Sequence, residues 1–121
     1  MNMDIGGPTG DLLLRLMSAS ALRAKVIAGN VSNQNTPGYK RQQVEFEDAL
    51  VRELGRATPD VKSVEPEITV DEGAPARADG NSVNMEDEVV AMRENRILYE
   101  LYANMLRGRS NLIRSAIHGE R

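Results

Sequence analysis

Apolar side chains recur at alternating steps of four and three residues near the start of the chain, and this spacing predicts a helix over about residues 11–34. The stripe runs through Leu13, Met17, Ser20, Ala24, Ile27 and Val31. The opposite side of the same helix carries a second apolar stripe, formed by Leu12, Leu16, Ala19, Leu22 and Val26. A helix that is apolar on two sides must be buried on both, so we expect it to pack between two partners.

A second helical pattern closes the chain and predicts a helix over residues 84–117. Asn84 stands at a favourable N-cap position, and the three carboxylates of residues 86–88 follow it, where they stabilise the positive end of the helix dipole. Gly108 lies inside the pattern and is a candidate bend or fray point. The main stripe comprises Met85, Val89, Met92, Tyr99, Ala103, Leu106, Ile113 and Ile117, and a flanking stripe comprises Leu98, Tyr102, Met105, Leu112 and Ala116.

The two terminal helices are expected to pair as a coiled coil in an all-α fold. Two helices that share one seam leave their second stripes exposed, and a hairpin of this kind has a small core. We therefore expect obligatory association with further copies or with related chains. The residues predicted to line the assembly seams are Leu13, Met17, Ala24, Ile27, Val31, Val89, Met92, Leu98, Tyr99, Met105, Leu106 and Ile113.

The middle of the chain, residues 35–82, shows no such periodicity. Four prolines and several glycines interrupt it, and it is acidic and poor in large apolar side chains. This composition predicts an irregular segment that resembles a linker and holds at most a short helix over 44–54 and a short extended piece over 64–70. The length of the chain predicts one domain over residues 1–121.

Residues 30–40, Asn-Val-Ser-Asn-Gln-Asn-Thr-Pro-Gly-Tyr-Lys, define how the first helix stops. Pro37 lacks an N–H and disfavours the helical conformation for Thr36, while Gly38 permits a positive φ. We expect this turn to direct the chain away from the helices toward the acidic middle. The ring of Tyr39 is expected to lie against a helix, with its hydroxyl near polar groups.

Composition and charge restrict the function classes. The chain has 121 residues, a net charge of −3 and 3% aromatic residues, and nothing in this balance indicates binding to nucleic acid. Basic residues gather toward both ends and acidic residues between them. This pattern indicates either solvated faces or attraction between the basic ends of one subunit and the acidic middle of another. The absence of cysteine excludes disulfides and Cys-ligated metals.

Two further segment types are missing from the sequence. No apolar run approaches the roughly 20 residues that span a bilayer. The first ten residues have neither the basic region nor the apolar region of a secretory signal. We therefore expect that any export of the protein proceeds without cleavage of a signal peptide.

No group of residues indicates catalysis, a cofactor or a metal site. His118 is the single histidine and, near the end of a helix, is interpreted as solvated. The acidic cluster 86–88 is interpreted as helix-dipole charge, and residues 79–81 as a turn, because the remaining ligands of a calcium loop are missing. We expect a structural protein and not an enzyme. The arginines interpreted as the rim of a coiled coil rather than as phosphate contacts are Arg107, Arg109 and Arg114.

Two stretches of the chain resemble a known family. Residues 28–40 resemble the N-terminal signature of the bacterial flagellar axial proteins, in which an Ala/Asn-rich helix end leads into Asn-Thr-Pro-Gly-Tyr-Lys. The segment that ends in Arg-Ser-Ala-Ile at 114–117 resembles their C-terminal partner helix. The short chain, with residues 44–50 and 80–84, is most similar to rod protein B of the proximal rod, and rod protein C is the close alternative. The turn-motif residues are Asn30, Asn33, Asn35, Thr36, Pro37, Gly38, Tyr39 and Lys40.

The resemblance implies a structural subunit of the flagellar basal-body rod. Such subunits assemble through their terminal helices into a hollow helical drive shaft that transmits torque and conducts exported subunits. The resemblance also implies type III export and a place above the export gate, inside the membrane-ring complex. Its partners would be copies of itself and other rod proteins. The alternative is a cytosolic coiled-coil adaptor or a small export chaperone, which explains the heptads but not the specific turn.

Overall fold

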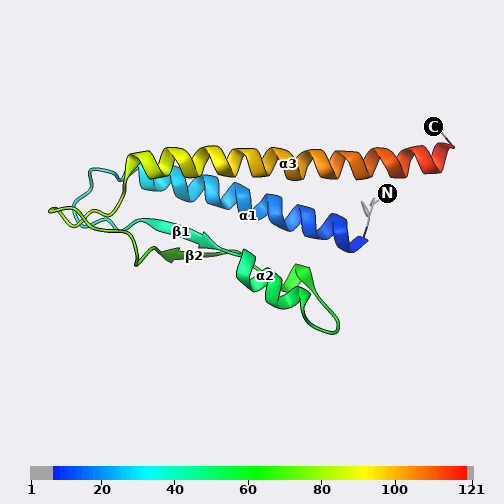
Figure 1. Ribbon diagram of the computed structural model, residues 1–121, viewed down its shortest axis with the longest axis horizontal. Helices are drawn as coiled ribbons and strands as arrows, with labels where there is room; N and C mark the ends of the chain where they lie inside the picture. The colour runs from blue at the N-terminus through cyan, green and yellow to red at the C-terminus, as the bar shows by residue number, and fades with distance from the viewer. Residues whose placement is uncertain (1–6, 120–121) are drawn as a thin grey trace.

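The computed structural model describes residues 7–119, an elongated arrangement in which two long helices lie side by side and smaller elements lie along one of them (Figure 1). In chain order the elements are α1 (Gly7–Ser32), β1 (Gln42–Glu45), α2 (Glu47–Leu54), the 3-10 turn η1 (Val61–Ser63), β2 (Glu67–Val70) and α3 (Met85–His118). The prediction about a secretory signal concerned the first ten residues, and residues 1–6 lie outside the part that the structure describes. No described helix is long and apolar enough to cross a bilayer.

Both predicted terminal helices are present. α1 begins at Gly7, earlier than predicted, and ends at Ser32. The N-cap of α3 is Asn84, as predicted, and its side-chain oxygen accepts hydrogen bonds from the backbone N–H groups of Glu86 at 3.0 Å and Asp87 at 3.4 Å. α3 runs without a break through Gly108, so the helix does not fray at this candidate bend or fray point.

α1 and α3 pack in an antiparallel pair. The side chain of Asn95 donates to the backbone C=O of Ser20 at 2.8 Å, and Asn30 lies 3.4 Å from Glu88 at the other end of the seam. On the α3 side, Glu88 and Asn95 are buried and Tyr102 is half-buried, so polar residues at steps of seven face α1. The pairing of the helices is confirmed, whereas a coiled coil remains a prediction.

The fold is mostly helical but not all-α, because β1 and β2 form a small antiparallel sheet. Gln42 lies opposite Val70, and Glu45 lies opposite Glu67. The short helix expected over 44–54 and the extended piece expected over 64–70 correspond to α2 and β2. The sheet was missed because pairing between strands far apart in the chain leaves no local periodicity of this kind.

The middle segment is not a linker, because it supplies most of the buried apolar cluster. Phe46, Leu50, Val61 and Val64 are buried together with Ala19 of α1. The second apolar stripe of α1 is therefore covered by the same chain, and α1 needs no other copy on that side. Sequence composition underestimated this segment because a few well-placed apolar residues suffice to cover one helix face.

Charges of α1 and of the middle segment pair within the chain. Arg23 lies 2.9 Å from Glu47, and Arg15 lies 2.9 Å from Glu65. Burial by itself would raise the pKa of Glu47, but the hydrogen bond from Arg23, backbone N–H groups and the arginine charge lower it below its ordinary value. A carboxyl group whose pKa is lower in the folded than in the unfolded state stabilises the fold when the pH is above the unfolded-state pKa. This contribution is lost as the pH falls through the folded-state pKa.

Hydrogen exchange in the isolated chain should differ sharply between the two long helices. We expect slow exchange through α1, which is covered on two sides, and fast exchange over residues 112–118 of α3, which extends beyond α1 (Figure 1). Leu112 and Ile117 there are 73% and 70% exposed. Mass spectrometry of the monomer would measure both rates. Rapid exchange throughout α1 would show that the chain does not complete its core without partners.

Candidate assembly site: a polar junction and an uncovered helix face

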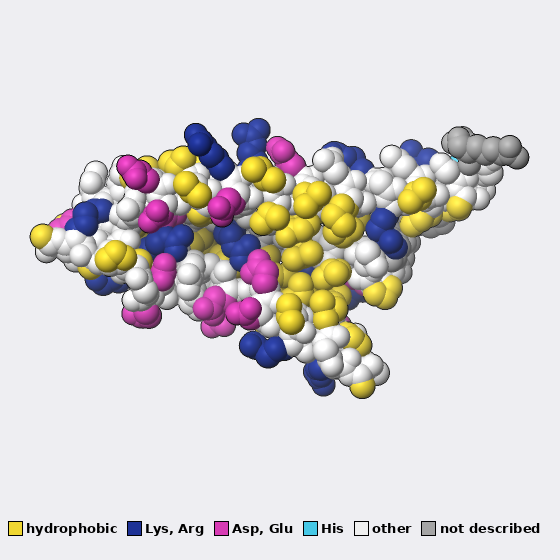
Figure 2. All heavy atoms as spheres, viewed as in Figure 1, with side chains coloured by type: hydrophobic (Ala, Val, Ile, Leu, Met, Phe, Trp, Pro, Cys, Tyr) yellow, Lys and Arg dark blue, Asp and Glu magenta, His cyan; other side chains and the backbone are white. Residues whose placement is uncertain are grey.

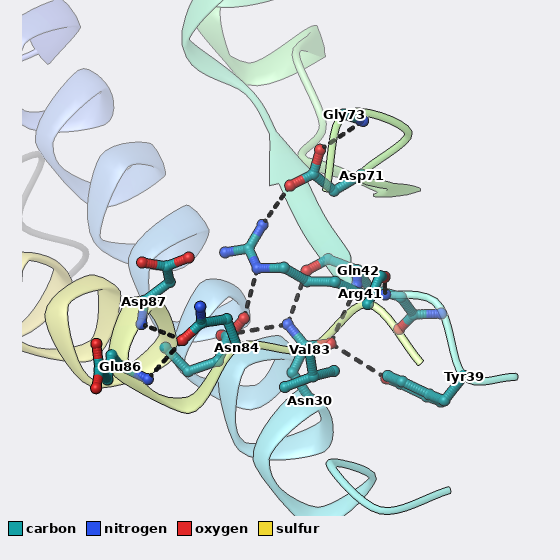
Figure 3. Close-up of polar contacts among 12 residues, drawn as sticks. Asn30, Tyr39, Arg41, Gln42, Asp71, Gly73, Val83, Asn84, Glu86 and Asp87 are labelled. Atoms are coloured by element: carbon teal, nitrogen blue, oxygen red, sulfur yellow. Dashed lines mark hydrogen bonds and ion pairs between the residues drawn. The ribbon is translucent and has the colours of Figure 1, made fainter. Parts of the chain in front are cut away.

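A cluster of polar side chains joins the end of α1 to the start of α3 (Figure 3). We call it the polar junction and define it by Asn30, Tyr39, Arg41, Asn81 and Glu88. Asn30, Asn81 and Glu88 are each 0% exposed. Because buried polar groups destabilise a fold unless they are hydrogen-bonded, their partners determine how the elements meet here.

Asn30 lies at the centre of the polar junction, in the last full turn of α1. Its side-chain N–H group donates to the backbone C=O of Gln42 at 2.9 Å and lies 3.4 Å from Glu88. Its side-chain oxygen accepts from the backbone N–H of Gln42 at 3.0 Å and from the hydroxyl of Tyr39 at 3.2 Å. One amide therefore joins α1, β1, the turn and α3.

Arg41 and Glu88 form the charged part of the polar junction. The Nε of Arg41 lies 2.5 Å from Oε1 of Glu88, and an Nη of Arg41 lies 2.9 Å from Asp71 (Figure 3). Burial would lower the pKa of Arg41, but its hydrogen bonds and charge attraction to Glu88 and Asp71 raise it above its ordinary value. Glu88 therefore forms a buried ion pair with Arg41 in addition to its predicted interaction with the helix dipole. No group of three metal-ligating side chains occurs among residues 7–119.

The turn motif is held by the segment that precedes α3. Gly38 has φ +74°, as expected, and its N–H donates to the backbone C=O of Asp79 at 2.9 Å. The side chain of Asn81 donates to the backbone C=O groups of Asn33 at 2.8 Å and Thr36 at 2.9 Å. These contacts support the expectation that the turn carries the chain away from α1 in a fixed direction.

The remaining motif residues play smaller parts. The side chain of Asn33 donates to the backbone C=O of Gly29 at 2.8 Å and so closes the end of α1. Lys40 donates to the C=O of Gly80 at 2.8 Å, while Asn35 and Pro37 are exposed.

The roles of Asn81, Glu88 and Asn95 were not predicted from the sequence. Glu88 and Asn95 could have been found from their spacing of seven residues on a helix whose neighbouring stripes are apolar. The role of Asn81 has no such local signal, because its partners lie in the turn at the far end of α1.

The predicted seam residues fall into different environments. Leu13 and Ile27 are buried. Those that are half-buried are Met17, Val31, Leu106 and Ile113. Those that are exposed in the single chain are Ala24, Val89, Met92, Leu98, Tyr99 and Met105.

The exposed apolar residues of α3 define what we call the uncovered face of α3. Figure 2 shows hydrophobic side chains gathered across the middle of one face of the molecule, over α3, α1 and α2. Exposed apolar patches of this kind mark sites of association with other chains. The uncovered face comprises Val90, Ile97, Leu98, Leu101 and Met105, which lie on one side of the helix and are 40–65% exposed.

Replacing Gly38 by valine should destabilise the turn through backbone strain alone. A Cβ at this position would meet no atom within 4 Å, but a β-branched residue resists positive φ. We expect a loss of about 1–3 kcal/mol in the free energy of unfolding for Gly38→Val. Gly38→Asn should lose less, because asparagine tolerates this conformation better. Equal losses for both variants in urea unfolding would contradict this cause.

An elongated helix pair with an uncovered apolar face is typical of a subunit that associates with other chains. The profile of the family described as "Flagella basal body rod protein" matches residues 17–40, which include the end of α1 and the turn. The flagellar basal body rod protein FlgB of Borrelia hermsii is 28% identical, over 85% of this chain and 90% of the relative. FlgB of Bacillus subtilis is 25% identical, over 85% and 88%. FlgB of Escherichia coli is 26% identical, over 76% and 80%.

The resemblance to flagellar basal body rod proteins that the turn motif predicted is confirmed by these matches. The rod protein B group is the one represented by these three relatives, which match along most of the chain.

Proposed function

We propose that this chain is a structural subunit of the flagellar basal-body rod. The observation that carries the proposal is the match along most of the chain to proteins named as rod subunits, together with the uncovered face of α3. Copies of the chain and other rod proteins bury this face and the neighbouring seam residues against one another. The product is a hollow helical shaft that transmits torque and conducts exported subunits.

The polar junction suits a subunit that carries mechanical load. It fixes the direction in which the middle segment leaves the helix pair, because Asn30 and Arg41 each bond to more than one element. A buried ion pair is a weak source of net stability but a strong constraint on geometry, since any other arrangement leaves a buried charge unpaired. We propose that this constraint keeps all subunits in one shape.

Location and partners follow from the same proposal. The rod extends across the inner-membrane ring into the periplasm, and its subunits are exported without signal cleavage. The export gate and the membrane-ring complex are further partners, and nucleic acid is not one. The whole chain, 1–121, acts as a single axial-protein domain. The alternative is a cytosolic coiled-coil adaptor or a small export chaperone, which would remain outside purified basal bodies.

The test is to isolate basal bodies from cells that produce Met105→Asp or Asn104→Asp. Met105 is 49% exposed on the uncovered face, so aspartate there should change the unfolding free energy of the isolated chain by less than about 0.5 kcal/mol. A charge buried in a subunit contact costs several kcal/mol, so Met105→Asp should be absent from basal bodies and cells should not swim. Asn104→Asp, at a neighbouring exposed polar position, should assemble normally. Absence of the unmodified chain from basal bodies would overturn the proposal.

A further inference from the structure

The small sheet has two edges, and its hydrogen-bond pattern shows which backbone groups face outward. The N–H of Asp71 donates to the C=O of Arg41 at 2.8 Å, just beyond the paired strands. In an antiparallel pair, hydrogen-bonded and non-hydrogen-bonded pairs alternate, so with this register every second residue points its N–H and C=O away from the partner strand. The outward-facing residues are Gln42 and Val44 on β1 and Ile68 and Val70 on β2.

The outer edge of β1 is closed by α1. The Asn30 side chain bonds to both the N–H and the C=O of Gln42. An Nη of Arg23 donates to the C=O of Val44 at 3.0 Å. Side chains of the helix therefore take the place that a third strand would occupy on this side.

The outer edge of β2 is open. Ile68 is 47% exposed and Val70 is 40% exposed, and no described residue bonds to their outward N–H and C=O groups. An open edge with apolar side chains is a template for pairing with another extended chain. The two side chains share the sheet face of the buried Val44, so a third strand would extend an apolar strip that already exists.

The charges beside this edge select what can bind to it. Glu45 lies directly opposite Glu67, both are exposed, and no described lysine or arginine forms an ion pair with either. Like charges directly opposite each other destabilise a sheet. β2 of a second copy cannot remove this repulsion in any register, because residues 65–73 contain no lysine or arginine. A strand with basic side chains would remove it.

We propose that the open edge of β2 binds an extended segment of a different protein chain in which apolar residues alternate with lysine or arginine. Its backbone bonds to Ile68 and Val70, and its apolar side chains extend the strip beside them. A basic side chain on the other face lies beside Glu67, which is the nearer of the two carboxylates. The proposal goes beyond the proposed function and rests on it only in taking that chain to be a neighbouring subunit of the rod.

Two synthetic peptides test the proposal in the full-length chain. The basic peptide is Thr-Lys-Val-Lys-Val-Lys-Val-Thr, and the acidic peptide has glutamate in place of each lysine. At a concentration of about ten times its dissociation constant, the basic peptide should slow exchange of the Ile68 and Val70 amides about tenfold, because only the unoccupied fraction exchanges. The acidic peptide should have no effect, and Glu67→Lys should reverse the preference. Equal effects of both peptides, or none at millimolar concentration, would overturn the proposal.

Val70→Pro and Val70→Ala separate the backbone donor from the side chain. Proline is tolerated where the N–H faces away from the ladder, so Val70→Pro removes only the outward donor, and Val70→Ala keeps it. Val70→Pro should bind the basic peptide more weakly than Val70→Ala and be depleted from basal bodies. If Val70→Pro assembles and binds the peptide like Val70→Ala, the edge proposal is wrong while the rod proposal stands. If the unmodified chain is absent from basal bodies, the rod proposal fails and the peptide result still decides the edge.

Discussion

Arg41→Ala is expected to lower the free energy of unfolding by about 3–5 kcal/mol, because it leaves a buried carboxylate without its ion partner. Glu88 is 0% exposed, and among the described residues the side chain of Asn30, at 3.4 Å, would be the remaining hydrogen-bond partner of its carboxylate. Urea unfolding of the isolated chain measures the loss. The slope of the transition must stay constant for the change to be assigned to stability.

Two further variants test the cause of this loss. Arg96→Ala removes the arginine of an exposed ion pair, in which Nε of Arg96 lies 3.2 Å from Oε1 of Glu100. This substitution should lower the free energy of unfolding by less than about 1 kcal/mol. Adding Glu88→Gln to Arg41→Ala should restore part of the stability, because a neutral amide is less costly to bury than an unpaired carboxylate. A loss in Arg41→Ala no larger than that in Arg96→Ala would show that the polar junction does not constrain the fold.

Phe46→Ala is expected to lower the free energy of unfolding by a similar amount, about 3–5 kcal/mol. Phe46 is 1% exposed, and its ring packs in the cluster through which the middle segment covers α1. Val51→Ala, on α2 but 68% exposed, should change stability by less than about 0.5 kcal/mol. Thermal or urea unfolding compares the two. Similar small effects would mean that the middle segment is the loose linker that its composition suggested.

The packing of the middle segment around Phe46 also determines where insertions should be tolerated. The composition of residues 35–82 predicted an irregular segment that resembles a linker, but Val61 and Val64 are buried and residues 67–70 pair with β1. Insertions between residues 61 and 70 are therefore expected to destabilise the fold. The exposed positions around Gly73 remain the better site within the middle segment.

Several features of this protein follow from the sequence because they depend on neighbours along the chain. The periodic apolar residues determined α1 and α3. Asn84 is the N-cap of α3, as expected of an asparagine that is followed by three carboxylates. Gly38 adopted the positive φ that its place after Pro37 indicated. The turn motif also carried the family resemblance, because a long and specific run of residues is recognisable without any tertiary structure.

Only the tertiary structure decided how these pieces join. The pairing of β1 with β2, the covering of α1 by Phe46 and its neighbours, and the burial of Glu88 against Arg41 connect residues that lie far apart in the sequence. Such contacts depend on which surfaces meet after the helices have formed, and no local propensity encodes them. For the same reason, sequence periodicity marked the apolar stripes of α3 but not which side faces α1 and which side stays uncovered.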